Sequence, residues 1–362
     1  MSERESEAEV APDGPGAATV SDAADPVEHF LEDMTYHGRT DRTRRGYERV
    51  LRGFESFLSD PTRNPLGEPS SLDDATHRHC MAWVHSLRGR LAEGTVATYA
   101  ANLHRFYDYM VQVGRFDDNP MALVTEEMDE SIEKDPARRE LDVSDMRRLV
   151  AETTHPLERA LFVTLLKTGM RVGELVNLDL RDLSLSVELD GYDVDARPQL
   201  AGRPDSLYVS ADPARGEGYN GETRAASNKR KRATVVPVDD ELAAVLTAWL
   251  AVRPDARSPA RPLFVATARK WGRRLRPDAV RHVVREHAEP LGWYREGGDA
   301  SENVTPHYFR HFFTTHLRER TGDRGVVKYL RGDVADDVID TYTHNWGDSV
   351  REAYERHVYS LL

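Results

Sequence analysis

Apolar residues recur at every third or fourth position along the whole stretch from Pro26 to Val124. Residues three and four apart share a face of an α-helix, so this spacing predicts amphipathic helices that pack on one another. The segments 26–34, 43–60, 75–90 and 94–114 all show the pattern, and we predict a small all-helical domain over 25–124. The most continuous stripe consists of Val96, Tyr99, Leu103, Phe106, Met110 and Val113.

A second domain is predicted over 141–346. The charged stretch 125–140, which Pro136 interrupts, is typical of an interdomain linker. Most of 141–346 again has helical spacing, and Ser144 is expected to cap its first helix. Between about 184 and 238, however, the short runs 184–189, 206–211 and 232–238 are of β type. The pattern predicts an α+β domain, mostly helical, with a small antiparallel sheet.

The two ends of the chain differ from these domains. Residues 1–24 are acidic and almost free of large apolar side chains, which predicts a disordered tail. Residues 347–362 carry Val350, Tyr354, Val358 and Leu361 at helical spacing. This stripe predicts a C-terminal helix with an apolar face that requires cover.

Charge is distributed unevenly. The net charge is −13, but residues 1–33 hold ten acidic residues and one basic one. Residues 36–52 instead contain six arginines, and 229–232 are four consecutive cations. The acidic total, which is typical of proteins from high-salt cytoplasms, therefore does not exclude a DNA partner; it requires a local DNA site.

Other features indicate a cytoplasmic protein. The single cysteine, Cys80, excludes an intrachain disulfide and fits a reducing compartment. Apolar runs such as 161–166 are too short to span a membrane, and the acidic N-terminus does not resemble a signal peptide.

A helix beginning at Thr305 and Pro306 places His307, Arg310 and His311 on one face. Histidines four apart could bind a metal, or the face could simply be solvated. It could also bind an anion, because arginine donates two hydrogen bonds to a phosphate and histidine moves protons. The segment alone leaves these three readings open.

Three more segments carry residues suited to phosphate chemistry. Arg171 follows a glycine turn at a helix start, and Glu174 lies one turn later, able to hold Arg171. Lys229 and Lys231 are expected on one face of a strand. Tyr342 stands late in the chain.

Together these segments resemble the tyrosine recombinases, or phage integrase family. The marks are TGMRVGEL (168–175), a lysine upstream of Pro237, HYFRH (307–311) and YTH (342–344), in the family's order. The resemblance covers about 141–346, and the helical domain before it matches the family's SAM-like core-binding domain in length and texture. Histidines 307 and 311 then belong to an anion site rather than a metal site.

The resemblance implies a role for each matching residue. Arg171 and Arg310 would clamp the scissile phosphate, and Tyr342 would attack it to form a 3′-phosphotyrosyl link. Lys229 would protonate the leaving 5′ oxygen, with Lys231 as the alternative, and His307 would assist proton transfer. Neither metal nor cofactor is implied. Glu174 and His311 would support the site.

Two departures from the family pattern stand out. The family usually has histidine or tryptophan nine residues before the nucleophile, where this chain has Asp333. That residue is either a sixth active-site position or the cap of a following helix. The insertion at 187–226 is expected to form a surface loop that contacts DNA or a neighbouring subunit.

We therefore expect a site-specific recombinase that cleaves and rejoins double-stranded DNA. The alternatives are a DNA-binding protein of the same fold with weakened or lost cleavage, and a type IB topoisomerase. By resemblance, the protein would act as a homo-oligomer, a tetramer on DNA, with 347–362 either packed on its own domain or exchanged between protomers. The expected DNA contacts are Arg39, Arg42, Arg44, Arg45, Arg49, Arg230 and Arg232.

Overall fold

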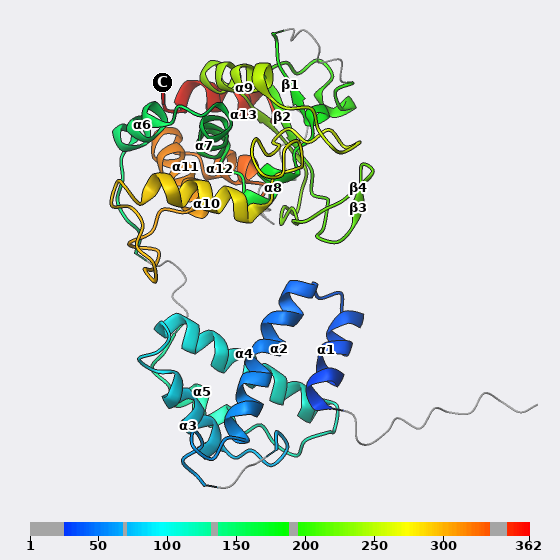
Figure 1. The fold of residues 1–362 in the computed structure, drawn as a ribbon, viewed down its shortest axis with the longest axis vertical. Helices are drawn as coiled ribbons and strands as arrows, with labels where there is room; N and C mark the ends of the chain where they lie inside the picture. The colour runs from blue at the N-terminus through cyan, green and yellow to red at the C-terminus, as the bar shows by residue number, and fades with distance from the viewer. Residues whose placement is uncertain (1–24, 68–70, 132–136, 188–194, 334–345) are drawn as a thin grey trace, which may run out of the picture. The chain divides into compact units, whose positions relative to one another are not determined.

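The computed structural model describes residues 25–67, 71–131, 137–187, 195–333 and 346–362. The chain divides into two compact units, Met1–Asp135 and Pro136–Leu362 (Figure 1). Helices dominate both, and the second unit adds a small antiparallel sheet, so the predicted fold class is confirmed. The predicted acidic tail (1–24) and Tyr342 lie outside the described residues.

The first unit is a helical bundle. Side chains of Asp25 and Thr40 accept hydrogen bonds from backbone N–H groups at the starts of its first two helices. The apolar stripe of the longest helix forms much of the core, where Phe106 packs edge-on against Phe30 at 5.5 Å between ring centroids. The helices are α1 (Pro26–Tyr36), α2 (Asp41–Leu58), α3 (His77–Leu87), α4 (Glu93–Gln112) and α5 (Ala122–Glu127).

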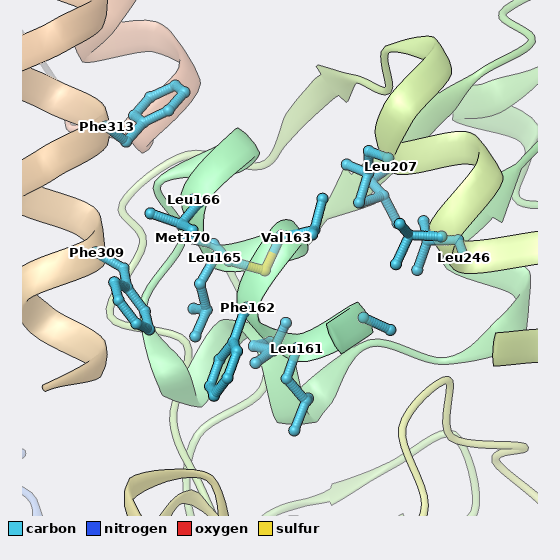
Figure 2. Packing of buried hydrophobic residues seen from close by; sticks show 14 of the residues in the cluster. Leu161, Phe162, Val163, Leu165, Leu166, Met170, Leu207, Leu246, Phe309 and Phe313 are labelled. Carbon is cyan, nitrogen blue, oxygen red and sulfur yellow. The ribbon is translucent and has the colours of Figure 1, made fainter. Parts of the chain in front are cut away.

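The second unit is built around a buried helix, α7. Apolar residues cover every side of it, and Figure 2 shows Phe309 and Phe313 from one neighbouring helix and Leu246 from another packed around it. Such all-round hydrophobicity is typical of a helix in a domain centre. The helices are α6 (Val143–Glu152), α7 (Pro156–Thr168), α8 (Val172–Asn177), α9 (Asp240–Val252), α10 (Pro277–Ala288), α11 (Pro306–Thr321), α12 (Arg324–Arg331) and α13 (Trp346–His357), with 3-10 turns at Leu180–Asp182 and Pro198–Leu200.

The sheet of this unit has three antiparallel strands in the order β1-β2-β5. Its strands are β1 (Leu183–Ser184), β2 (Ser206–Val209) and β5 (Thr234–Pro237), and Leu207 pairs with both Leu183 and Val236. A separate hairpin pairs β3 (Gly218–Tyr219) with β4 (Glu222–Thr223). Since β5 begins only at Thr234, the prediction that Lys229 and Lys231 lie on a strand is wrong: both lie in the loop before it.

Two local predictions are also corrected. The helix at 143–152 is capped by Asp142, whose carboxylate accepts from the backbone N–H of Asp145 at 2.9 Å, and not by Ser144. The start of the predicted linker is helical, because α5 continues to Glu127 and buries Val124 in the core of the first unit.

The described part of the predicted insertion, 195–226, is attached to the domain by buried charge. Arg224 is 1% exposed and donates to both carboxylate oxygens of Asp179, at 3.2 and 2.8 Å. The centroid of the Tyr219 ring lies 5.2 Å from the guanidinium carbon of Arg224, which is a cation–π contact. The insertion is therefore tied into the domain and is not purely a surface loop.

The C-terminal segment packs on its own domain. Tyr354 and Tyr359 are buried, and their hydroxyls donate to the backbone carbonyls of Lys167 and Leu166 at the end of α7. In return, the Lys167 ammonium donates to the carbonyl of Tyr359 at 2.6 Å. Among the described helices, none combines the length and apolar character needed to cross a membrane.

Candidate active site

Arg171 is placed by the turn that ends α7. Gly169 has φ +60°, and a Cβ there would lie 2.2 Å from the ring of Phe313, so both conformation and space require glycine. Two residues later, Arg171 precedes α8. The buried Glu174 accepts from its backbone N–H at 2.9 Å and from its guanidinium at 3.1 Å. This is the contact that the one-turn spacing predicts.

Arg310 reaches the same turn from α11. Its side chain is 2% exposed and donates to the carbonyl of Gly169 at 2.7 Å. Both terminal nitrogens also donate to the carbonyl of Arg331, at 3.3 and 3.2 Å. These contacts fix the guanidinium, because its planar geometry leaves few other orientations that satisfy them.

The carboxylate of Asp333 joins three guanidinium groups. One of its oxygens accepts from Arg171 at 3.1 Å and from Arg310 at 3.0 Å, and the other lies 2.9 Å from Arg331. Asp333 follows Gly332, which ends α12 at φ +67° and turns the chain back toward the arginines. The predicted sixth position therefore points into the arginine cluster. The residues that would form a helix after it lie outside those described.

Burial and neighbouring positive charge lower the pKa values of two of these arginines. Burial, reinforced by Arg171 and Arg331, lowers the pKa of Arg310 to about 9. That value still leaves the guanidinium charged at neutral pH. Burial also lowers the pKa of Arg331, while the Asp333 carboxylate opposes the change. Arg310 therefore offers the Asp333 carboxylate a charged donor.

His307 is an exposed residue of α11 within electrostatic reach of this cluster. Partial desolvation lowers its pKa below 6.5, and so do the positive charges of Arg138, Arg310, Arg171 and Arg331. The imidazole is therefore neutral at pH 7. His311, one turn later, is half-buried, with its ring 6.5 Å from that of Tyr308.

The four cations at 229–232 divide into two groups. Lys229, Lys231 and Arg232 are exposed, whereas Arg230 is 4% exposed and is directed into the domain, where it pairs with Glu174 at 3.3 Å. The prediction that Arg230 contacts DNA from the surface is therefore wrong. Both terminal nitrogens of its buried guanidinium have hydrogen-bond partners, as a charge in the interior requires.

The arginines predicted to bind DNA in the first unit lie mainly on α2. Arg39, Arg42, Arg45 and Arg49 are exposed, and Arg44 is half-buried. Arg44 and Arg45 lie 3.4 and 3.0 Å from Asp41. The helix thus presents a basic surface on which Asp41 balances part of the charge.

Arg331 is a further cation of the site, and it lies two residues before Asp333, where it could substitute for the family's histidine or tryptophan. Arg331 ends α12, and its position against Asp333 depends on the left-handed turn at Gly332 that follows. In the sequence, Gly332 after Arg331 indicates where the helix ends. It does not indicate where the arginine side chain points.

Family models match both units. The model for the phage integrase N-terminal SAM-like domain matches residues 27–114, and that for the phage integrase family matches residues 218–347. Among relatives, tyrosine recombinase XerC of Pelotomaculum thermopropionicum is 27% identical, covering 91% of this chain and 96% of the relative. Tyrosine recombinase XerD of Listeria monocytogenes is 25% identical, covering 93% and 98%.

Solved structures share the fold. An integrase of the transposon Tn1549, in complex with a circular intermediate DNA, has a TM-score of 0.62 at 17% identity, covering 91% of this chain and 98% of that one. A lambda integrase dimer bound to a COC′ core site has a TM-score of 0.59 at 14% identity, covering 87% and 96%.

Proposed function

Because the chain belongs to the phage integrase family of tyrosine recombinases, we propose that it cleaves and rejoins duplex DNA at specific sites through a 3′-phosphotyrosyl intermediate. The observation that carries this proposal is the carboxylate of Asp333 held by three guanidinium groups. Arginine forks suit carboxylate and phosphate oxygens alike. The aspartate therefore occupies the kind of site that a DNA phosphate would take.

The chemistry follows from the charges around that site. The hydroxyl oxygen of Tyr342 attacks phosphorus, and the bond from phosphorus to the 5′ oxygen breaks. Arg171 and Arg310 balance the negative charge that builds on the phosphate oxygens. Neutral His307 is suited to accept the phenol proton, and Lys229 donates one to the leaving oxygen. The reverse steps rejoin the strand.

We propose that Asp333 competes with the DNA phosphate. The two anions cannot share one set of guanidinium groups without strong repulsion, so the phosphate must displace the carboxylate. Arg331 then becomes a third donor available to the phosphate, two residues before the position where the family pattern has histidine or tryptophan.

We also propose that the protein binds double-stranded DNA in the cytoplasm and acts as a tetramer. The XerC and XerD relatives are named as tyrosine recombinases, and one lambda integrase structure is a tetramer on a Holliday junction. Residues 25–124 would serve as the core-binding domain. Exchange of 347–362 between protomers would recreate in the neighbour the contacts that Tyr354 and Tyr359 make within one chain.

The test is capture of the covalent adduct. The DNA bound by the protein in cells is identified by sequencing, and a nicked form of that target is incubated with the protein. The wild type should form a protein–DNA adduct stable to denaturant. Tyr342→Phe should abolish the adduct and retain binding, and Arg310→Ala should abolish it with some loss of affinity.

Tyr354→Phe is the matched control, because it removes one tyrosine hydroxyl that is buried and bonded to α7. It should still form the adduct. Adduct loss in Tyr354→Phe but not in Tyr342→Phe would overturn the nucleophile assignment.

The second candidate is a DNA-binding protein without cleavage. It is favoured by one observation: the acid at 333 neutralises the clamp where the family has histidine or tryptophan. Tight, sequence-specific binding with no adduct on any nicked target would select this candidate.

A further inference from the structure

The side chain of Arg230 lies between the segments that carry Arg171 and Arg331. Its flanking residues Lys229 and Lys231 are exposed, yet the Arg230 side chain is fully buried. Placing a guanidinium in the interior is costly unless its donors are bonded. A buried cation within an otherwise exposed basic loop therefore needs a structural reason.

The contacts of Arg230 supply that reason. One terminal nitrogen donates to Glu174 at 3.3 Å, and both donate to the carbonyl of Leu330 at 3.2 Å. Thr234, at the start of β5, accepts at 2.7 Å. Glu174 also holds Arg171, and Leu330 directly precedes Arg331. A single guanidinium thus links the basic loop to the segments that carry Arg171 and Arg331.

The fit around Arg230 is close on its other side. Gly332 has φ +67°, and a Cβ there would lie 2.5 Å from Cγ of Arg230 and 2.6 Å from a terminal nitrogen. Any side chain at 332 would therefore push against the arginine. The backbone that leads to Asp333 closes directly onto Arg230, so movement of one affects the other.

The loop has fixed points on both sides of the lysine. The backbone N–H of Asn228 donates to the carbonyl of Pro213 at 2.9 Å, and β5 pairing begins at Thr234. Between these points, Arg230 connects the loop to Glu174 and Leu330. Lys229 is its chain neighbour, so the anchored arginine determines where the lysine backbone stands relative to the clamp.

We propose that Arg230 is a positioning residue that sets Lys229 for protonation of the leaving 5′ oxygen. This inference rests on the proposed function. Arg230 does not touch the phosphate; it acts by holding the lysine loop against Glu174 and the end of α12. Its loss should therefore impair the proton-transfer step in particular, and not only the stability of the domain.

The test compares two nicked substrates that differ in one atom. In one, the bond to be broken joins phosphorus to the normal 5′ oxygen; in the other, sulfur replaces that oxygen. A thiolate leaves without a proton because thiols are far more acidic than alcohols (the cysteine thiol has a pKa of about 8.5), whereas an alkoxide requires an acid. Single-turnover adduct formation is measured with both for wild type, Lys229→Ala, Arg230→Met and Arg230→Lys.

We expect Lys229→Ala and Arg230→Met to be slowed by roughly 100-fold or more on the oxygen substrate and to approach the wild-type rate on the sulfur substrate. Arg230→Lys keeps a donor but loses the fork, so its ratio of the two rates should lie between those of wild type and Arg230→Met. It also serves as the folded variant if the methionine change proves too destabilising, with thermal melts establishing the folded state of each.

The matched control is Arg224→Met, which removes an equally buried arginine whose partner is Asp179 rather than Glu174. Its ratio of oxygen to sulfur rates should equal that of the wild type. Folded Arg230 variants that are slow on both substrates would overturn the positioning role. If Lys229→Ala itself is not rescued by sulfur, the assignment of Lys229 fails instead, and absence of any wild-type adduct contradicts the proposed function.

Discussion

The guanidinium of Arg310 lies 3.0 Å from a carboxylate oxygen of Asp333, so a deeply buried cation of the site is balanced by an acid of its own chain. The same oxygen accepts from Arg171 at 3.1 Å. Without DNA, this contact relieves repulsion between the two arginines. With DNA, we propose that the same carboxylate opposes the incoming phosphate.

Asp333→Asn should therefore bind DNA more tightly than the wild type, by roughly tenfold, or about 1.4 kcal/mol. It should also melt at a lower temperature without DNA, because the arginines lose their shared counter-ion. Fluorescence anisotropy with the labelled target and thermal melts measure the two effects. Asp278→Asn, which removes one acid from the exposed face of α10, controls for net charge. Equal affinities of the two variants would contradict competition at the clamp.

His307 should make the domain less stable in mild acid. Its pKa is lowered from 6.5 by partial desolvation and by nearby arginines, Arg138 foremost. Since the unfolded chain then binds the proton more readily than the folded one, the stabilising contribution is complete above about pH 6.5 and is lost as the pH falls below it. Between pH 7 and 5.5 the melting temperature should fall more for wild type than for His307→Gln. His282→Gln, an exposed change on α10, should retain the wild-type slope.

The sequence could predict those features that depend on local periodicity. The stripe of Val96, Leu103, Phe106 and Met110 is buried as expected, and the Arg171–Glu174 contact follows from one-turn spacing. The direction of a side chain within an irregular loop could not be predicted. Arg230 is buried between two exposed lysines because of Glu174 and Leu330, which are distant in sequence.

The inward direction of Asp333 was equally inaccessible from the sequence. A lone acid after glycine is compatible with a helix cap, and only the left-handed turn at Gly332 together with three converging arginines directs it into the site. The side-chain directions of Arg230 and Asp333 both depend on charged partners that are distant in sequence, and not on local propensity.

The packing of the C-terminal segment 347–362 on its domain should depend on Lys167. This ammonium is 1% exposed and lies 2.5 Å from Asp239, 2.7 Å from Glu241 and 2.6 Å from the carbonyl of Tyr359. Lys167→Met leaves these acceptors without their cation, so the free energy of unfolding should fall by about 3–5 kcal/mol. Denaturant unfolding measures the loss, and limited proteolysis should cleave 358–362 sooner. Lys270→Met, at an exposed position, should change neither; a stable Lys167→Met with a protected tail would contradict the anchor.

Arginines of α2 should contribute to DNA affinity without contributing to sequence choice. Arg42 and Arg49 are exposed and seven residues apart, so they share one face of the helix with Arg45, which is 3.0 Å from Asp41. Contacts to phosphate release counter-ions, so Arg42→Ala and Arg49→Ala should each weaken binding on specific and random duplexes alike. Each should reduce the slope of log K against log salt concentration by about 1.

Arg45→Ala should have a smaller effect, because Asp41 already offsets part of that charge, although an exposed pair of this kind is weak. Arg281→Ala on α10 supplies the control, since it also removes an exposed, acid-paired arginine. Titrations at several salt concentrations separate the variants. If the Arg42 and Arg49 slopes match that of Arg281→Ala, this face of α2 does not lie on the phosphate backbone, and the DNA surface of the first unit must be sought on another helix.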